Sequence, residues 1–410
     1  MKVCVLTLGC KVNQYESDSV VKSLKESGFS VTESLEFADV YVVNSCAVTA
    51  EAERKSRQML SRIRALNKDA RIIVVGCAAE NNSEQFVRLG AEYVSGNAGK
   101  WKVAEYLRDG TPFACGAPAE EYEDCYSQYT SNAKAYVKIQ DGCNNFCSYC
   151  LIPYLRGRSR SRSVASVLEE INNTTAPEII LTGINLSDYR TDDGGLTELI
   201  LALCDSDKRI RLGSLEVNAI TGDFLKALSG LKNFCPQFHL SLQSGSDSVL
   251  KSMNRHYTRE EFLQKCEMIY AAFPDCALTT DVIVGFPTET ERDFRDTLDL
   301  MERAAFADAH IFPYSPRKGT KAKGRLPQEI VNERKAKITA LRNRLKEKYL
   351  SEKLGSEENL LAEEYVGGFT VGYTGNYIRC YLPKEEKTGK IIKVVLKELY
   401  LDGVKVGEKE

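Results

Sequence analysis

The chain lacks the features of a membrane or secreted protein. No apolar run is long enough to span a bilayer, and residues 1–6 run straight into a strand pattern without the architecture of a signal peptide. We therefore expect a cytoplasmic protein with no membrane partner.

The chain also lacks an excess of charge of one sign and has little histidine. Fifty-five Lys and Arg residues face 57 Asp and Glu residues, which gives a net charge of −2. Any surface that binds nucleic acid must therefore be a local basic patch. The three histidines, His239, His256 and His310, provide few nitrogen ligands for a metal. We find no long internal repeat and no low-complexity block.

The chain is long and rich in cysteine. Its 410 residues exceed the usual size of one core, so we expect two or three domains. Fourteen cysteines are many for a reducing compartment, where disulfides are rare, so a clustered subset is expected to bind metal or do chemistry. The eight outside any motif are expected to be buried free thiols: Cys4, Cys115, Cys125, Cys204, Cys235, Cys266, Cys276 and Cys380.

The first hundred residues alternate strand and helix patterns. Strand patterns cover residues 3–8, 39–43 and 71–75, and helical patterns cover residues 17–27 and 51–66. This alternation predicts a parallel sheet flanked by helices. The periodicity is then lost over residues 113–131, which are rich in Glu, Tyr, Ser and Pro, and we interpret them as a linker.

A second alternating series follows. Its strand patterns cover residues 136–140, 178–182, 209–213, 237–243, 277–284 and 307–314. Six βα units fit a partly closed parallel barrel, and a doubly wound sheet remains the alternative. A long charged helix at 327–354 closes this part. Short strands at 360–366, 377–382 and 391–399 then predict a small all-β barrel of a kind that often binds oligonucleotides.

The strongest chemical signal is the C-x3-C-x2-C triplet Cys143, Cys147 and Cys150. It follows the first strand of the second series, where parallel barrels usually place their active sites. Thiolates bind iron–sulfur clusters, and three of them hold three irons of a cubane, which leaves the fourth iron open. The alternative is a zinc knuckle, which needs a fourth Cys or His nearby, and all three histidines are remote in sequence.

A second trio is more widely spaced. Cys10, Cys46 and Cys77 each lie just past the carboxyl end of a predicted strand of the N-terminal sheet. Parallel strands end at one edge, so the three thiols are expected to converge there and to hold a second cluster with one open iron. The alternative is three unrelated buried thiols.

The triplet resembles the signature of the radical S-adenosylmethionine (SAM) superfamily. That resemblance implies a 4Fe-4S cluster whose open iron binds the methionine part of SAM, and cleavage of SAM to a 5′-deoxyadenosyl radical. Residues 7–17 (TLGCKVNQYES), 43–49 (VNSCAVT) and 75–78 (VGCA) are similar to the N-terminal domain of the methylthiotransferases, and residues 139–154 to their radical SAM domain. The C-terminal module resembles their TRAM domain.

The resemblance implies an α/β fold in four parts. These are an N-terminal methylthiotransferase domain at 1–112 with a doubly wound parallel sheet and an auxiliary cluster, the linker at 113–131, a radical SAM domain at 132–355 with a partial (β/α)6 barrel, and an RNA-binding TRAM barrel at 356–410.

The sequence around Cys10 and at residues 52–58 (AERKSRQ) resembles that of the MtaB branch of the family. This implies methylthiolation of C2 of N6-threonylcarbamoyladenosine at position 37 of tRNA, with two 4Fe-4S clusters, two molecules of SAM and no catalytic side chain beyond the cluster ligands. The implied partners are the tRNA anticodon stem-loop, an electron donor and a sulfur source. The alternatives are an isopentenyladenosine or ribosomal-protein substrate, or a non-enzymatic iron–sulfur RNA-binding protein.

Three further residues are candidate SAM contacts. Gly183 follows the second barrel strand, where a missing side chain allows close backbone approach. Glu216 is suited to accept hydrogen bonds from the ribose hydroxyls, and Arg255 has the fork that fits a carboxylate. Residues 281–287 resemble the strand beside the adenine. Ordinary packing or a surface ion pair is the alternative for each.

The basic run at residues 156–162 follows the cluster loop directly. We predict that Arg156 and Arg158 bind the phosphate backbone of tRNA, because Arg pairs well with phosphate. The alternative is a solvated loop. Tyr373, Tyr377 and Arg379 are candidates for stacking on RNA, although tyrosines in small β-modules more often pack across strands.

Overall fold

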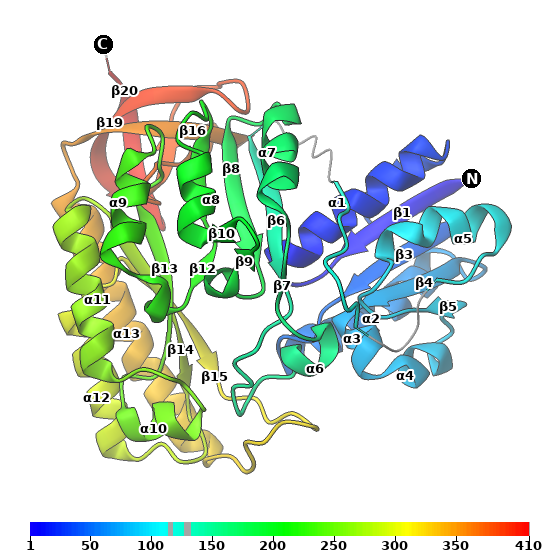
Figure 1. The fold of residues 1–410 in the computed structure, drawn as a ribbon, viewed down its shortest axis with the longest axis horizontal. Helices are drawn as coiled ribbons and strands as arrows, with labels where there is room; N and C mark the ends of the chain where they lie inside the picture. The colour runs from blue at the N-terminus through cyan, green and yellow to red at the C-terminus, as the bar shows by residue number, and fades with distance from the viewer. Residues whose placement is uncertain (114–117, 127–132, 410) are drawn as a thin grey trace.

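The computed structural model describes residues 1–113, 118–126 and 133–409. An N-terminal sheet domain lies beside a larger central domain, and a small barrel covers one end of the central domain (Figure 1). No helix among the described residues is both long and apolar enough to cross a membrane.

The N-terminal domain contains a five-stranded parallel sheet with the strand order β2-β1-β3-β4-β5. Its strands are β1 (Lys2–Thr7), β2 (Ser30–Thr32), β3 (Val40–Ser45), β4 (Arg71–Gly76) and β5 (Tyr93–Val94). Its helices are α1 (Lys11–Glu26), α2 (Ala50–Leu66), α3 (Cys77–Asn81), α4 (Ser83–Arg88), η1 (Lys100–Lys102) and α5 (Val103–Asp109).

Both faces of this sheet are apolar, which is why both carry helices. Alternate residues of each strand point to opposite faces. Val3 and Val5 pack with α1 and α5, while Cys4 and Leu6 pack with α2 and α4. Helix α1 begins at Lys11, six residues before the predicted helix at residue 17, so the chain enters the helix directly after Cys10.

The central domain follows the predicted βα series. Its strands are β6 (Lys134–Asp141), β7 (Arg160–Ser161), β8 (Glu178–Gly183), β9 (Arg190–Thr191), β10 (Gly194–Gly195), β11 (Arg209–Leu212), β12 (Ser214–Leu215), β13 (Gln237–Gln243), β14 (Ala277–Val284) and β15 (Asp308–Pro313). Its helices are α6 (Ile152–Arg156), α7 (Val164–Asn173), η2 (Leu186–Asp188), α8 (Leu196–Ala202), η3 (Val217–Ala219), α9 (Gly222–Gly230), α10 (Asp247–Ser252), α11 (Arg259–Ala272), α12 (Glu291–Arg303) and α13 (Gln328–Glu352).

The central strands form two four-stranded sheets, with the orders β11-β8-β6-β7 and β12-β13-β14-β15. The third predicted strand is divided between them at Gly213, whose N–H donates to the carbonyl of Leu181 at 2.8 Å. A Cβ at Gly213 would lie 3.0 Å from that same carbonyl oxygen. The close approach of β8 therefore bends the strand from one sheet into the next.

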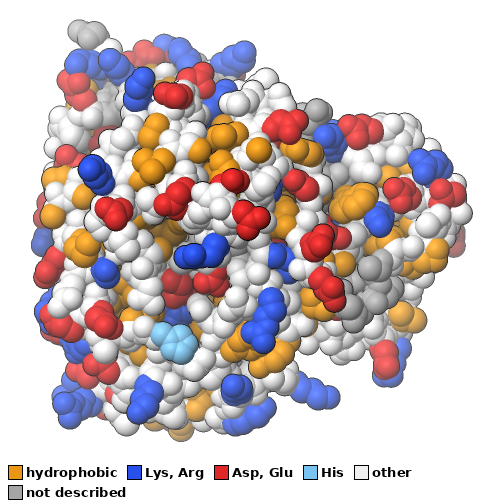
Figure 2. Space-filling view, in the orientation of Figure 1, with side chains coloured by type: hydrophobic (Ala, Val, Ile, Leu, Met, Phe, Trp, Pro, Cys, Tyr) orange, Lys and Arg blue, Asp and Glu red, His pale blue; other side chains and the backbone are white. Residues whose placement is uncertain are grey.

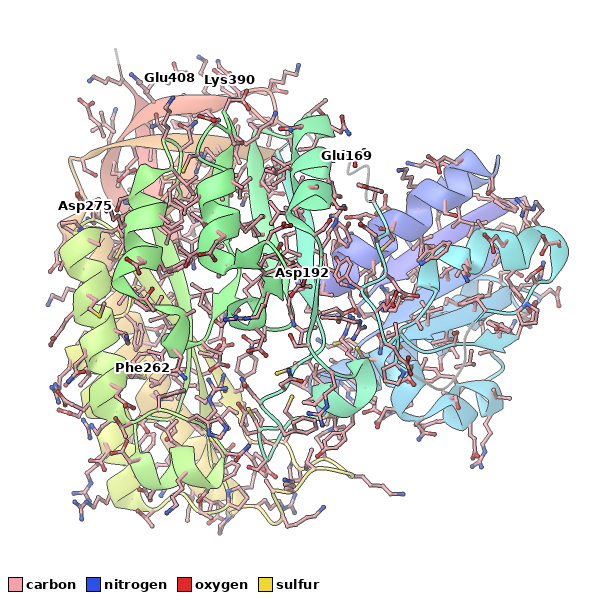
Figure 3. All side chains as sticks on the ribbon, viewed as in Figure 1. Glu169, Asp192, Phe262, Asp275, Lys390 and Glu408 are labelled. Atoms are coloured by element: carbon pink, nitrogen blue, oxygen red, sulfur yellow. The ribbon has the colours of Figure 1, made fainter. Side chains whose placement is uncertain are left out.

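The helices cover one face of these two sheets and bury one large apolar core. Phe262 of α11 is fully buried in that core (Figure 3). The strand residues that alternate with the core residues face the other side, and this inner face is described below because many of its residues are charged.

The C-terminal barrel has the closed strand order β16-β17-β18-β20-β19. Its strands are β16 (Glu357–Val366), β17 (Phe369–Tyr373), β18 (Arg379–Leu382), β19 (Ile391–Tyr400) and β20 (Gly403–Glu408). The predicted α/β character and the small C-terminal all-β barrel are confirmed. The barrel has five strands rather than the three predicted, because β17 and β20 had no predicted counterpart.

The predicted linker is described only at residues 113 and 118–126, and Cys115 lies outside the described residues. The described part bonds to both domains. Tyr15 of α1 donates to the carbonyl of Cys125 at 2.5 Å, and the Tyr122 hydroxyl donates to the carbonyl of Lys138 at 2.6 Å. Residues 118–126 therefore hold the N-terminal and central domains together.

Candidate metal centres and the adjoining pocket

The structure brings the first cysteine trio to one edge of the N-terminal sheet. In the strand register, Thr7 lies opposite Asn44 and Ser45 lies opposite Gly76. Cys46 and Cys77 directly follow Ser45 and Gly76, and Cys10 lies three residues beyond Thr7. Parallel pairing thus places the three thiols at the carboxyl ends of adjacent strands.

Two glycines allow these thiols to approach one another. A Cβ at Gly9 would lie 2.4 Å from the sulfur of Cys46, and the φ of Gly9 is +103°. A Cβ at Gly76 would lie 2.5 Å from the carbonyl oxygen of Ser45, and its φ is +99°. Both positions therefore need glycine for space and for backbone conformation.

The three thiols affect one another electrostatically and receive hydrogen bonds. Burial, followed by the charges of Cys10 and Cys77, raises the pKa of Cys46 to about 11. The N–H of Val48 donates to the sulfur of Cys46 at 3.5 Å, and Nε of Arg156 donates to the sulfur of Cys77 at 3.3 Å. Donors of this kind stabilise the thiolate that a cluster needs.

The second trio lies on one loop after β6. The sulfur of Cys143 accepts from the N–H of Asn145 at 3.5 Å, and the sulfur of Cys150 accepts from the N–H of Ile152 at 3.4 Å. The sulfur of Cys147 accepts from Arg255 at 3.5 Å. Burial raises the pKa of Cys143 to about 11 and that of Cys150 to about 12, and the charge of Cys147 adds to both shifts.

Neighbouring segments fix the shape of this loop. A Cβ at Gly142 would lie 1.9 Å from the carbonyl oxygen of Arg158, so the loop passes directly against the chain beyond it. The N–H of Ser148 donates to the carbonyl of Met253 at 2.9 Å, and Asn254 donates through its side chain to the carbonyl of Asn145 at 2.8 Å. The loop is therefore held from both sides.

Both trios supply the donor set of an iron–sulfur cluster. Across the described residues, no three His, Cys, Asp or Glu side chains are close enough to hold one metal ion. Each trio offers three thiols as ligands, and N–H groups donate to their sulfurs.

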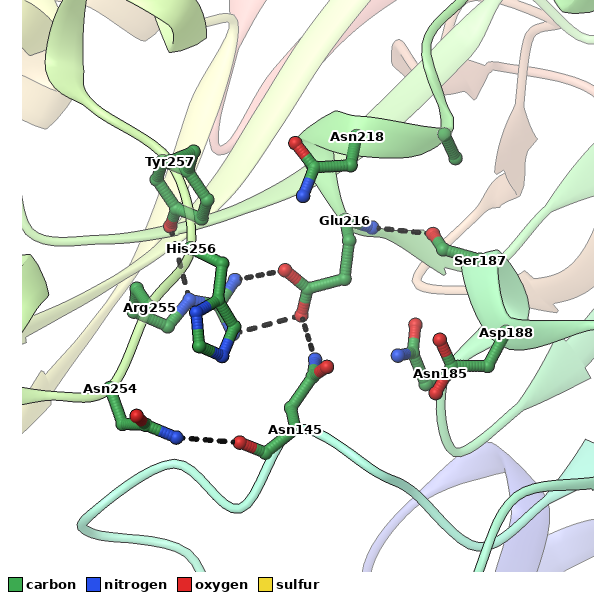
Figure 4. A pocket seen from close by; sticks show the side chains of 11 residues that line it. Asn145, Asn185, Ser187, Asp188, Glu216, Asn218, Asn254, Arg255, His256 and Tyr257 are labelled. Atoms are coloured by element: carbon green, nitrogen blue, oxygen red, sulfur yellow. Dashed lines mark hydrogen bonds and ion pairs between the residues drawn. The ribbon is translucent and has the colours of Figure 1, made fainter.

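A polar pocket lies beside the Cys143 loop (Figure 4). Arg255 and Glu216 face each other across it: one nitrogen of Arg255 donates to Oε1 of Glu216 at 2.8 Å, and the second nitrogen pairs with Oε2. Asn145 of the cluster loop also donates to Glu216, at 3.3 Å. Two of the residues predicted to contact SAM thus lie in one pocket next to the triplet, paired with each other.

Gly183 ends β8 near this pocket, but Asn185 lines it. The side-chain oxygen of Gln140 accepts from the N–H of Asn185 at 2.8 Å, and a Cβ at Gly183 would lie 3.0 Å from Cβ of Gln140. The glycine therefore lets β6 and β8 approach each other, and its predicted contact with SAM stays a prediction.

The structure contradicts the prediction that Arg156 binds phosphate. Its side chain is 0% exposed and lies between the two domains. It donates to Glu16 at 2.8 and 3.0 Å, to Asp141 at 3.0 Å and to Asn13 at 2.9 Å, in addition to the sulfur of Cys77. Two buried carboxylates and a thiol occupy its donors, so no phosphate can reach it.

Sequence reasoning missed the buried charges around Arg156. Lys100 and Lys138 also pair with Glu16, at 2.6 and 2.8 Å, and Lys138 pairs with Asp141 at 2.7 Å. Burial alone would raise the pKa of Glu16, but the charges of Arg156, Lys100 and Lys138 hold it well below its usual value. The feature of the sequence that could have indicated this network is Glu16, an acidic residue within the helix that follows Cys10.

Arg158 is in a different position from Arg156. Its side chain is exposed, and its guanidinium lies 4.5 Å from the centre of the Phe146 ring in the cluster loop. It is therefore available to a phosphate next to the triplet. Figure 2 shows basic (blue) and acidic (red) side chains interspersed over one face of the molecule. This agrees with a local basic patch rather than a basic surface over the whole face.

The C-terminal tyrosines partly pack against their own neighbours. The rings of Tyr373 and Tyr377 are stacked, with centroids 4.9 Å apart. Lys134 lies over Tyr373 and Arg211 lies over Tyr377, so the pair joins the barrel to the central domain. Arg379 pairs with Asp402 at 2.8 Å.

The cysteines outside the two trios are mostly buried, as predicted. Cys4, Cys235, Cys266, Cys276 and Cys380 are buried free thiols. Cys125 and Cys204 are free thiols as well but only half-buried.

Two family profiles match the chain. Residues 2–96 match the uncharacterized protein family UPF0004, and residues 137–301 match the radical SAM superfamily. The first match contains Cys10, Cys46 and Cys77, and the second contains the Cys143 triplet.

Named relatives align along nearly the whole chain. The chain is 36% identical to "Threonylcarbamoyladenosine tRNA methylthiotransferase MtaB" of Chlamydia pneumoniae, over 92% of this chain and 91% of that protein. It is 35% identical to the protein of that name from Bacillus subtilis, over 96% and 93%. It is 33% identical to "tRNA-2-methylthio-N(6)-dimethylallyladenosine synthase" of Endomicrobium trichonymphae, over 98% and 99%.

Solved structures share the fold at low identity. The radical SAM methyltransferase TsrM from Kitasatospora setae, solved with cobalamin and a 4Fe-4S cluster, has a TM-score of 0.56 and 15% identity, over 77% of this chain and 76% of that one. The radical SAM enzyme OxsB, solved with aqua-cobalamin and SAM, has a TM-score of 0.53 and 13% identity, over 83% and 56%.

Proposed function

The chain belongs to the radical SAM tRNA methylthiotransferase family and uses 4Fe-4S clusters and SAM, and from this premise we propose that it methylthiolates C2 of N6-threonylcarbamoyladenosine at position 37 of tRNA. The observation that carries the proposal is the pair of three-thiol sites. Each offers only three ligands, so each leaves one iron of a cubane open.

The residues divide between two sites. Cys143, Cys147 and Cys150 would hold the cluster that binds SAM, and Cys10, Cys46 and Cys77 would hold the auxiliary cluster. When bound, the two clusters and two molecules of SAM supply the radical and the methylated sulfur. The chain holds the thiolates in place through N–H donors to their sulfurs.

The pocket residues would orient SAM. The guanidinium of Arg255 has the fork that fits a carboxylate, and Glu216 has the acceptors that suit ribose hydroxyls. Because these two side chains pair with each other, binding of SAM at both would exchange one ion pair for two new contacts. Close backbone approach at Gly183 completes the proposed set.

The RNA would be bound outside this pocket. The exposed Arg158 is the proposed phosphate contact beside the cluster loop. The closed barrel at residues 356–410 is the proposed TRAM domain, following an N-terminal methylthiotransferase domain at 1–112 and a radical SAM domain at 132–355. An electron donor and a sulfur source are the other partners that the chemistry requires.

The substrate is tested by anaerobic incubation of the reconstituted protein with SAM, a reductant and tRNA, followed by mass spectrometry of the nucleosides. We expect a methylthio mass gain on tRNA bearing threonylcarbamoyladenosine and none on tRNA bearing isopentenyladenosine. A gain on the second tRNA alone would assign the enzyme to the other tRNA branch. No gain on either, despite cleavage of SAM, would point to a ribosomal protein.

The two sites are separated by single cysteine variants. Cys147→Ala is expected to abolish SAM cleavage, whereas Cys46→Ala is expected to keep some cleavage and to lose methylthiolation. Cys204→Ala removes a half-buried thiol outside both trios and serves as the matched control. A wild-type yield of product from Cys46→Ala would rule out the two-cluster scheme.

A further inference from the structure

The inner face of the central sheets is charged. Ala135, Ile179, Ile210 and Leu278 pack into the helical core. Residues that alternate with such core positions point to the opposite side of a sheet. The inner face therefore carries charged residues from four strands: Lys134, Glu178, Arg211 and Asp281.

The cations that belong to these strands have partners. Arg211 pairs with Glu178 at 2.8 Å and donates to the carbonyls of Thr374 and Gly375 at 3.0 Å each. Lys134 pairs with Glu363 at 2.5 Å and lies over the ring of Tyr373. Their charges are thus largely compensated inside the protein.

Lys11 is the exception on this side of the molecule. It is the first residue of α1, which packs against β6 and β8. Within the described part of the chain, no carboxylate lies within 4 Å of its ammonium group, and its side chain makes no hydrogen bond. Lys11 thus faces the charged strands without a partner of its own.

The surroundings of Lys11 leave its ammonium group available to an anion. Its side chain is exposed to solvent and lies near the cations Arg211 and Lys134 and the carboxylates Glu178 and Asp281, but it pairs with none of them. An exposed ammonium group without a carboxylate partner, close to two other cations, is free to pair with an incoming anion.

We propose that Lys11 binds the carboxylate of the threonyl group on the modified adenosine and so selects this substrate. This inference rests on the proposed function. Lys11 directly follows Cys10, so a base that presents its C2 to sulfur at the Cys10, Cys46 and Cys77 site enters beside Lys11. The threonylcarbamoyl group is attached to the same six-membered ring as C2, so its carboxylate arrives with the base.

The same arrangement disfavours an apolar substituent. An isopentenyl group would occupy the space beside Lys11 without supplying a negative charge, so the ammonium group would lose water and gain no partner. Specificity of this kind comes from the penalty on the wrong ligand as well as from the contact with the right one. A phosphate of the RNA backbone is the other source of an anion, and the experiment separates the two.

The test uses two anticodon stem-loop RNAs that differ at one group. The first carries threonylcarbamoyladenosine, and in the second the threonyl carboxylate is replaced by a hydroxymethyl group. Dissociation constants are measured by fluorescence anisotropy with the full-length protein, and KM and kcat with the reconstituted enzyme. Lys11→Gln removes the charge, Lys11→Arg keeps it, and Lys25→Gln, an exposed lysine on the same helix, is the matched control.

Loss of the RNA carboxylate should weaken binding to the wild type, to Lys11→Arg and to Lys25→Gln by about tenfold, as expected for a hydrogen bond to a charged group. Lys11→Gln should bind the RNA that carries the carboxylate about tenfold more weakly than the wild type does. It should bind the neutral RNA as tightly as the wild type does. KM should follow these values while kcat stays within about twofold. Iron content and SAM cleavage, measured in parallel, should match the wild type.

The contrary outcomes are distinct. Equal weakening of both RNAs by Lys11→Gln would mean that Lys11 binds phosphate, and no weakening of either would mean that it binds no anion. Both results overturn the inference while wild-type activity on threonylcarbamoyladenosine upholds the function. Wild-type activity on isopentenyladenosine alone would overturn both the function and the inference.

Discussion

Two arginines that are neighbours in the sequence have opposite surroundings. Arg156 is completely buried with Glu16 and Asp141, whereas Arg158 is exposed beside Phe146. We expect Arg156→Ala to lower the free energy of unfolding of the cluster-free protein by about 3–5 kcal/mol, because it leaves buried carboxylates with one cation fewer. Arg158→Ala should change it by less than about 0.5 kcal/mol.

Denaturant unfolding and tRNA binding at several salt concentrations together test this pair. Arg158→Ala should weaken tRNA binding and flatten its salt dependence, as expected when one phosphate contact is lost. If both variants unfolded at the same denaturant concentration, the assignment of Arg156 to the buried network would be wrong.

A buried carboxylate in α1 makes stability depend on pH. Burial raises the pKa of Asp18 to about 7, and Oδ2 of Asp18 has no hydrogen-bond partner among the described residues. A carboxyl whose folded pKa is raised stabilises the folded state at low pH, and this contribution is lost as the pH rises through the folded pKa. Asp18→Asn, which cannot ionise, should therefore be more stable than the wild type by about 2 kcal/mol at pH 8.

The advantage of Asp18→Asn should grow as the pH rises from about 4 to about 7 and then stay constant. Thermal unfolding of both proteins across this range would measure it. A difference that is independent of pH would mean that Asp18 stays ionised in the folded protein.

At the scale of elements, the turn between β1 and α1 decides whether the auxiliary site can form. Gly9 combines a positive φ with a Cβ position only 2.4 Å from the sulfur of Cys46. Gly28 also has a positive φ, +82°, but open space around it. Gly9→Ala should therefore lose about half of the bound iron after reconstitution, whereas Gly28→Ala should keep all of it and lose only about 1 kcal/mol of stability.

Iron analysis and Mössbauer or EPR spectra of the two glycine variants would distinguish these outcomes. Full iron occupancy in Gly9→Ala would show that the turn can move without cost, against the crowding seen here.

The cysteine positions could be predicted because strand ends are visible in the sequence. Apolar runs locate β1, β3 and β4, and parallel pairing then fixes which residues share an edge. Arg156 could not be predicted, because a basic run gives no sign of which residues turn inward when another domain packs on it. Strands β17 and β20 were missed because their glycines weaken the alternating pattern.

At the scale of the whole molecule, one arginine joins the barrel to the central domain. Arg211 is 1% exposed and donates to the carbonyls of Thr374 and Gly375 while it pairs with Glu178. Arg211→Met should loosen this joint and release a fragment near residues 356–410 about tenfold faster in limited proteolysis, because two buried hydrogen bonds are lost.

Arg379→Met is the control for this joint, because it removes a partly exposed pair with Asp402 inside the barrel. Its rate of cleavage should match the wild type. Resistance of Arg211→Met to the protease would show that the tyrosine and lysine contacts hold the barrel on their own.

The closed interface between the first two domains also constrains how the holoprotein is built. Cys46 and Cys77 are only 2% and 3% exposed, and Arg156 is sealed in above Cys77. Cys10 is half-buried, so the closed protein leaves the site open only on the side of this residue. Iron delivered to the closed protein must therefore enter on the side of Cys10, or the interface must open at the expense of its buried ion pairs.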